Sequence, residues 1–248
     1  MRQRYFLLLS ILLIVGSPAA IQAGWNDWAK QLGGVLQPGG SQDSAAGLSQ
    51  ADIAAGLREA LGVGVERAIA LLGRDGGFLN DAQVRIPMPG ALQTVEKGLR
   101  AAGQGAIADE FVQTINHAAE QAAPEARAIF VDAIRSMTLE DAGKILNGPD
   151  DAATRYFRER SEARLAAAVR PVVERATARV GVTSSYKRMV GGLGPLARLA
   201  VPGGLDLDRY VTQKTVDGIF IKLAEEEKRI RKDPMARSTE LLKQVFGG

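Results

Sequence analysis

The 248-residue sequence contains no cysteine. Without cysteine the chain cannot form a disulfide, cannot bind zinc through thiolates and cannot be acylated at a lipoprotein-type cleavage site. The stability of the fold must therefore come from packing. The 225 residues that follow a predicted leader are enough for one large or two modest domains with a real hydrophobic core.

Histidine is almost as scarce, because His117 is the only one. A single histidine excludes a zinc site built from several histidines, and no G-x-S-x-G motif indicates a serine hydrolase. His117 lies three residues before Glu120, but the helical step turns it to the polar side of its segment. Glycines at 103–105 and 191–194 lack the preceding strand and the Lys-Ser/Thr sequel of a phosphate-binding loop. We therefore predict a solvated histidine, and no catalytic, metal-binding or cofactor-binding residue.

Long apolar runs are also rare, and the one clear run lies at the N-terminus. Arg2 and Arg4 precede an apolar stretch from Tyr5 to Val15, and Ala23 offers a small residue before Gly24. This layout is typical of a secretory signal peptide, and the stretch is too short to span a bilayer. We predict a signal peptide over 1–23, a periplasmic or otherwise exported protein, and no integral membrane segment after its removal.

The charge balance gives little reason to expect a nucleic-acid partner. The formal net charge of +3 falls to about +1 without Arg2 and Arg4, so the calculated pI of 9.3 reflects near balance rather than a basic field. Binding to nucleic acid would need a clustered basic patch. Any partner is more consistent with an unknown protein or small molecule in the cell envelope.

Residues 24–47 are rich in Gly, Pro and Ser and predict a flexible linker. From Leu48 to the end of the chain, apolar residues recur at helical spacing, and Ser49 with Asp52 and Thr138 with Asp141 resemble capping boxes. The pattern predicts an all-α, bundle-like domain over 48–248.

Several aromatic and aliphatic residues lie at the centres of the apolar stripes. Helix packing is predicted to depend on Phe111, Phe130, Phe220 and Leu223. The one long non-helical interruption is 78–90, where Pro87 and Pro89 exclude a central strand. We expect an ordered extended loop there, held by Phe78, Leu79, Ile86 and Met88.

Arginine is concentrated in a long predicted helix over 152–180, which contains Pro171 and is expected to bend there. Glutamates are interleaved, so that Arg155/Glu159 and Arg158/Glu162 fall at i, i+4. A solvated, salt-bridged face is the favoured interpretation, and a docking surface for an anionic partner is the alternative.

The penultimate helix, expected over 207–230, carries three consecutive glutamates. Glu225/Arg229 and Glu227/Arg231 also fall at i, i+4 in the favourable orientation. These pairs predict structural support of the helix. A further amphipathic helix is expected at 236–246.

Four blocks of the sequence together resemble the DUF4197 family of exported bacterial proteins of unknown function. They are LGRDGGFLNDAQVRIPMP, INHAAEQAAPEARAIFVDAI, MTLEDAGKILNGPDDAATRYF and LDRYVTQKTVDGIFIKLAEEEKRIRKDPMARSTELLKQVFG, and the resemblance covers about residues 48–246. It implies an envelope location and a mostly helical fold without an established activity. Two features depart from the family pattern: an extra glycine at Gly76-Gly77-Phe78, and His117 where arginine is usual.

The same blocks contain polar residues that packing does not obviously require. They are Asn116, Glu120, Tyr156, Lys214 and Asp217. Buried polar networks that fix helix register would account for them, and this interpretation is favoured. They could alternatively line a groove between helices that binds a ligand or partner.

Three hypotheses of function follow. The leading one is an exported binding module for a protein partner or a small amphiphilic ligand. The second is a metal-independent enzyme that uses a carboxylate, tyrosine and lysine set in an interhelical groove. The third is a structural assembly module with the arginine-rich helix as its interface. A pocket lined by the five polar residues would favour the first two.

Overall fold

The computed structural model describes residues 49–179, 182–191 and 205–232. All of them belong to one compact unit. The predicted signal peptide, linker and final helix at 236–246 lie outside the described residues. None of the helices described is both long and apolar enough to cross a membrane.

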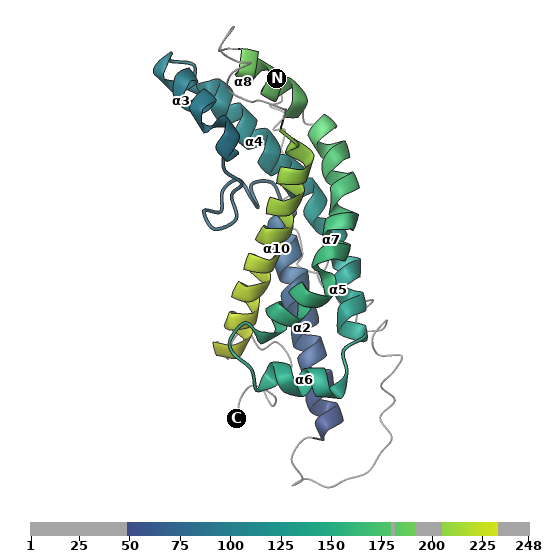
Figure 1. Ribbon diagram of the computed structural model, residues 1–248. Helices are drawn as coiled ribbons and strands as arrows, with labels where there is room; N and C mark the ends of the chain where they lie inside the picture. The colour runs from purple at the N-terminus through teal and green to yellow at the C-terminus, as the bar shows by residue number, and fades with distance from the viewer. Residues whose placement is uncertain (1–48, 180–181, 192–204, 233–248) are drawn as a thin grey trace, which may run out of the picture. The chain divides into compact units, whose positions relative to one another are not determined.

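The described residues form α-helices and two short 3-10 turns, without a strand (Figure 1). The all-α prediction is therefore confirmed. The 3-10 turns are Gly90–Leu92 and Ala123–Glu125. The helices are α2 (Gln50–Leu72), α3 (Gln93–Ala101), α4 (Gly105–Ala122), α5 (Ala126–Arg135), α6 (Leu139–Leu146), α7 (Ala152–Arg179), α8 (Val182–Gly191) and α10 (Leu207–Lys232).

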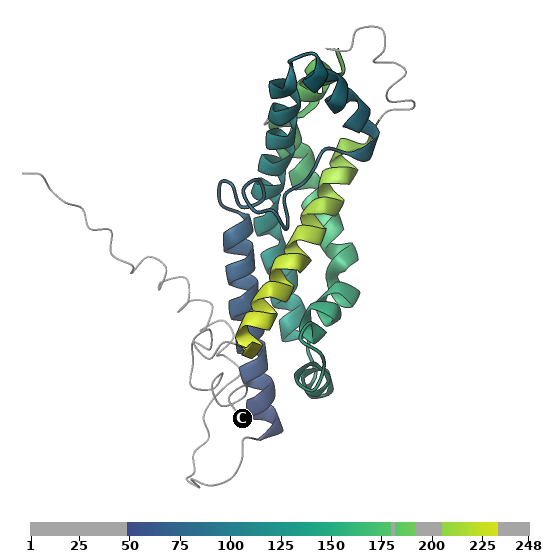
Figure 2. The same ribbon diagram turned by 90° about the vertical axis from the view of Figure 1, so that its left-hand side faces the viewer.

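The long helices pack around one core. Helix α10 packs along α7, α2 and α4, and α5 lies against α2 and α7 (Figures 1 and 2). Helix α8 contacts α4 and α7, while α3 packs on α4. The loop between α2 and α3 consequently lies beside both α4 and α10, and this position determines the candidate site.

The predicted aromatic core is confirmed. Phe111, Phe130, Phe220 and Leu223 are all at most 3% exposed. The Phe130 ring meets the Phe220 ring edge-on at 6.0 Å, and it meets the ring of Phe157 in the same way at 5.5 Å. Edge-to-face contacts at these distances place the positive edge of one ring against the negative face of the next. One aromatic cluster thus joins α5, α7 and α10.

Both capping boxes form as predicted. The Ser49 side chain accepts from the Asp52 backbone N–H at the start of α2, and Thr138 does the same with Asp141 at the start of α6. In each case the aspartate bonds back to the backbone N–H of the cap residue. These hydrogen bonds define where α2 and α6 begin, and they involve only residues that are close in sequence.

One local feature differs from the expected pattern. Helix α8 lies in a stretch of loose apolar pattern that predicts no element. Helix α7 contains Pro171 and continues to Arg179, and the bend expected at the proline stays a prediction.

Candidate functional site

The loop that connects α2 to α3 is ordered largely by its own buried side chains. Phe78 and Ile86 are completely buried and Met88 is 6% exposed, as predicted, whereas Leu79 is only half-buried. Turn hydrogen bonds, such as Val84 N–H to the Asp81 carbonyl at 3.2 Å, fold the backbone between these anchors. The apolar anchors account for the burial of the loop but leave its inner backbone groups in need of partners.

Two buried side chains of α4 supply those partners. One Glu120 carboxylate oxygen, Oε1, accepts from the backbone N–H groups of Phe78 at 3.0 Å and Leu79 at 3.1 Å. Asn116 accepts from the Ile86 N–H at 2.8 Å and donates to the Ile86 carbonyl at 2.9 Å. Both side chains are thus part of a buried polar network, and what they fix is the position of the loop on α4.

Helix α10 holds the outer side of the same loop. Lys222 Nζ lies 2.5 Å from the Asp81 carboxylate and 2.7 Å from that of Glu225. Burial alone would lower the pKa of Lys222, but the Asp81 and Glu225 carboxylates raise it, so the side chain stays charged. The Tyr210 hydroxyl donates to the Pro87 carbonyl at 2.9 Å.

Glycine at position 218 makes this contact between α10 and the loop possible. A Cβ there would lie 2.6 Å from Cε1 of Phe78 and 3.4 Å from Val84. The Phe78 ring is fully buried, so it has no free space into which to move. Gly77 is equally constrained, because a Cβ there would lie 2.4 Å from the Leu71 carbonyl oxygen.

His117 is less solvated than the helical pattern predicts. Its Nδ1 lies 2.7 Å from Oε2 of Glu120, and its side chain is 34% exposed. The histidine is thus partly exposed but also bonded to the buried Glu120, so the expected solvated side chain is found only in part. Among the described residues no three His, Cys, Asp or Glu side chains are grouped in a way that could hold a metal ion.

The outward side of the loop lines an open groove with a volume of about 970 Å³. A second hollow of about 450 Å³ continues past α4 and shares Leu79, Asn80, Arg85 and Asp109 with the first. The lining of the larger groove comes from the loop, α3 and α4, and consists of Leu79, Asn80, Ala82, Arg85, Pro87, Met88, Gln93, Glu96, Lys97, Arg100, Asp109 and Val112.

The carboxylates in these hollows are paired with arginines. Arg100 contacts Glu96 at 2.9 Å and Asp109 at 2.6 Å, and these two carboxylates raise the pKa of its guanidinium, Asp109 the more strongly. Glu110, in the second hollow, pairs with Arg188 of α8. By contrast, Arg85 and Lys97 are exposed. Neither has an ion pair with a described carboxylate.

The five predicted site residues do not meet in one place. Asn116 and Glu120 bind the loop from inside, whereas Lys214 and Asp217 form an ion pair at 3.6 Å on the outer part of α10. Arg158 of α7 also approaches Asp217, at 4.0 Å. None of the five lines either hollow described above.

Tyr156 occupies a third place, near the start of α7. Its ring meets Phe157 edge-on at 5.6 Å and lies under the Arg160 guanidinium at 4.9 Å. Burial, followed by the Asp141 carboxylate, raises the pKa of its hydroxyl. A role for these five residues in binding a ligand or partner stays a prediction.

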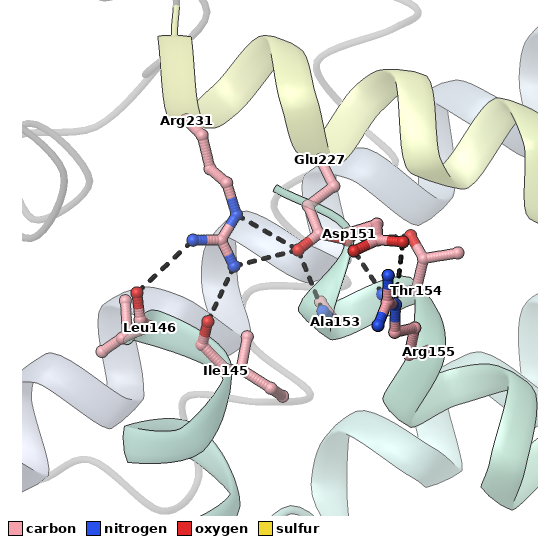
Figure 3. Close-up of polar contacts among 8 residues, drawn as sticks. All are labelled: Ile145, Leu146, Asp151, Ala153, Thr154, Arg155, Glu227 and Arg231. Carbon is pink, nitrogen blue, oxygen red and sulfur yellow. Dashed lines mark hydrogen bonds and ion pairs between the residues drawn. The ribbon is translucent and has the colours of Figure 1, made fainter. Parts of the chain in front are cut away.

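A second buried polar cluster joins α6, α7 and α10 (Figure 3). Glu227 accepts from the N–H groups of Ala153 and Thr154, both at 2.9 Å, and from the Thr154 hydroxyl at 2.8 Å. Arg231 donates to Glu227 at 2.9 Å and to the Ile145 carbonyl at 2.8 Å. The carboxylate thus lies at the positive N-terminus of α7 and the guanidinium at the negative C-terminus of α6.

The Glu227 cluster is structural. The cavity beside it measures only about 10 Å³, which is no more than a single water needs. Every polar atom of Glu227 and Thr154 is occupied by protein groups. The predicted Glu227/Arg231 pair is confirmed, while Glu225 and Arg229 take Lys222 and Glu226 instead of each other.

The arginine-rich face of α7 carries several salt bridges, in agreement with the salt-bridged face that the sequence predicts. Arg158 pairs with Glu162, and Arg170 with Glu174. Arg155 pairs with Asp151 at 2.9 Å rather than with Glu159, because Asp151 lies one turn before it at the start of the helix (Figure 3). Each of these exposed pairs contributes little stability.

The sequence did not identify Arg85 and Lys97 as residues of a groove. Arg85 lies in a loop without periodicity, and Lys97 occupies an ordinary exposed helical position. The only signal was a basic side chain within the proline-containing segment.

Comparison with known proteins identifies one match. A family model described as a protein of unknown function, DUF4197, matches residues 47–247. No curated protein and no solved structure matches the chain.

Proposed function

The chain belongs to the DUF4197 family, and from its geometry we propose that it is an exported binding module whose groove beside the α2–α3 loop holds a ligand or partner. The observation that carries this proposal is the way the loop is fixed. Buried Asn116 and Glu120 hold its backbone from α4, and nearly buried Lys222 holds it from α10.

A loop fixed in this way is better explained by a binding role than by the need to connect α2 to α3. The buried charges of Glu120 and Lys222 carry a desolvation cost that an apolar anchor would avoid. In return, the outward residues Ala82, Arg85 and Pro87 are presented from a backbone that does not have to be ordered when a partner binds. Rigid presentation of a loop over a groove is the arrangement that binding sites commonly use.

The exported location is proposed from the N-terminal segment alone. Arg2 and Arg4, the short apolar stretch and Ala23 support cleavage before Gly24. We expect the intact mass of the protein recovered from its native cells to equal that of residues 24–248, without added lipid. A membrane-bound form that retains residues 1–23 would contradict the proposal.

The binding role can be tested by filling the groove. Ala82 is exposed and lines the groove, so Ala82→Trp should obstruct it without disturbing the core. We expect native mass spectrometry of the wild-type protein from its own cells to show a bound small molecule or polypeptide. The Ala82→Trp variant should lose that species.

The matched control is Ala178→Trp, at an exposed position of α7 outside the groove. This variant should keep the bound species in the wild-type proportion. Retention by both variants would place binding elsewhere, and a wild-type protein that carries nothing would count against the binding module.

A further inference from the structure

The charges of the groove are unbalanced in a specific way. Glu96 and Asp109 are both engaged by Arg100, and Glu110 is engaged by Arg188. Each carboxylate that lines the two hollows therefore has an arginine partner, although Arg100 carries one positive charge for two of them. With Arg85 and Lys97 included, four cations face three carboxylates, so the net charge is about +1.

The cations without a carboxylate partner are Arg85 and Lys97, which come from two different elements of the groove. Arg85 belongs to the loop and lines both hollows, while Lys97 lies on α3. Both are exposed, and neither has an ion-pair partner in the part of the chain that the structure describes. Two cations without partners that line one groove attract carboxylates of a bound chain.

Apolar groups lie between and beside these cations. Pro87 is exposed, Leu79 is half-buried, and Met88 and Val112 contribute to the lining from their buried positions. A ligand that suits the groove must therefore present apolar side chains as well as negative charge. An inorganic anion alone would leave the apolar part of the lining in contact with water.

The openness of the groove, rather than its volume, favours a peptide over a small amphiphile. Sites for small ligands enclose most of the ligand surface, usually within about 300–1,000 Å³ of concave space. Here two open hollows of about 970 and 450 Å³ share lining residues of the loop and α4, and the larger one is also lined by α3. An extended segment can follow such a path with only one of its sides covered.

We propose that this groove binds an extended, acidic and partly apolar peptide segment of a protein partner. Carboxylates of the segment pair with Arg85 and Lys97, and its apolar side chains lie on Pro87, Met88 and Val112. This inference rests on the proposed function, because it specifies the occupant of the same groove.

The test measures binding of a short fluorescent peptide rich in glutamate and leucine to residues 24–248, by fluorescence anisotropy. The double variant Arg85→Glu/Lys97→Glu should bind this peptide at least about tenfold more weakly, and wild-type affinity should fall as salt is added. The matched control, Arg135→Glu/Arg175→Glu, changes the net charge equally at exposed positions outside the groove and should bind like the wild type. Circular dichroism and thermal melting show whether each variant is folded.

Four outcomes would overturn the inference. If the wild type bound a peptide with glutamine at every glutamate equally tightly, charge would have no role in binding. If the control variant also bound the acidic peptide tenfold more weakly, the effect would come from the net charge of the protein and not from the groove. If no peptide binds while Ala82→Trp still displaces a natively bound species, the binding module stands and its acidic peptide partner does not. If Ala82→Trp displaces nothing either, both proposals fail.

Discussion

Replacing Phe130 with alanine is expected to lower the free energy of unfolding by about 3–5 kcal/mol. The side chain is 1% exposed and its ring contacts both Phe157 and Phe220 edge-on. Alanine would remove the buried apolar surface, leave a cavity where three helices meet and abolish two aromatic contacts. Chemical denaturation of the wild-type and variant proteins, followed by circular dichroism at one wavelength, measures the difference.

The control for this prediction is Leu139→Ala. Leu139 is a large apolar residue but is 50% exposed at the start of α6. Its truncation should change the free energy of unfolding by no more than about 0.5 kcal/mol, as is usual for surface substitutions. A loss below about 1 kcal/mol for Phe130→Ala would mean that the core can collapse around the missing ring.

Elements that depend on local sequence could be predicted well. The apolar stripes that contain Phe130 and Phe220 identified the buried helix faces, because burial in a helix repeats with the helical turn. The caps at Ser49 and Thr138 were equally legible, since their hydrogen bonds span only three residues. Helix α8 was not, because its stretch has no sustained stripe.

Contacts between distant segments could not be read from spacing. Asn116 and Glu120 were singled out as polar residues at the edge of an apolar face, and both are buried. Their partners, Ile86, Phe78 and Leu79, lie 30 to 42 residues earlier in the chain. No period connects a helix to a loop backbone, so the reason for their burial required the fold.

The same limit applies to the groove. Pro87 and Pro89 predicted an ordered extended loop, whereas turns occupy 75–80 and 82–84. The face that the loop presents depends on how α4 and α10 hold it. Arg85 and Lys97 line a common groove only because the fold places the loop beside α3 and α4. The five predicted site residues were grouped only because they are polar and lie in the blocks that resemble the family. Tyr156, Lys214 and Asp217 lie away from the loop that Asn116 and Glu120 hold.

Replacing Glu227 with alanine is expected to lower the free energy of unfolding by about 3–5 kcal/mol, the usual cost of breaking a buried ion pair by removing one partner. Glu227 is 5% exposed, and Arg231, whose side chain is 12% exposed, would be left without its carboxylate. The N–H groups of Ala153 and Thr154 would also lose their acceptor at the start of α7. Chemical denaturation provides the measurement.

Two further variants separate the causes of this loss. Glu227→Gln keeps an oxygen for one N–H of α7 but removes the charge that faces Arg231, so it should destabilise the protein less than alanine does. Glu174→Ala breaks the exposed pair with Arg170 and should leave the denaturation midpoint within error of the wild type. If Glu227→Ala were equally silent, the carboxylate would not be what joins α10 to α6 and α7. Because the cluster lies apart from the groove, a folded Glu227→Gln variant should bind the acidic peptide as the wild type does.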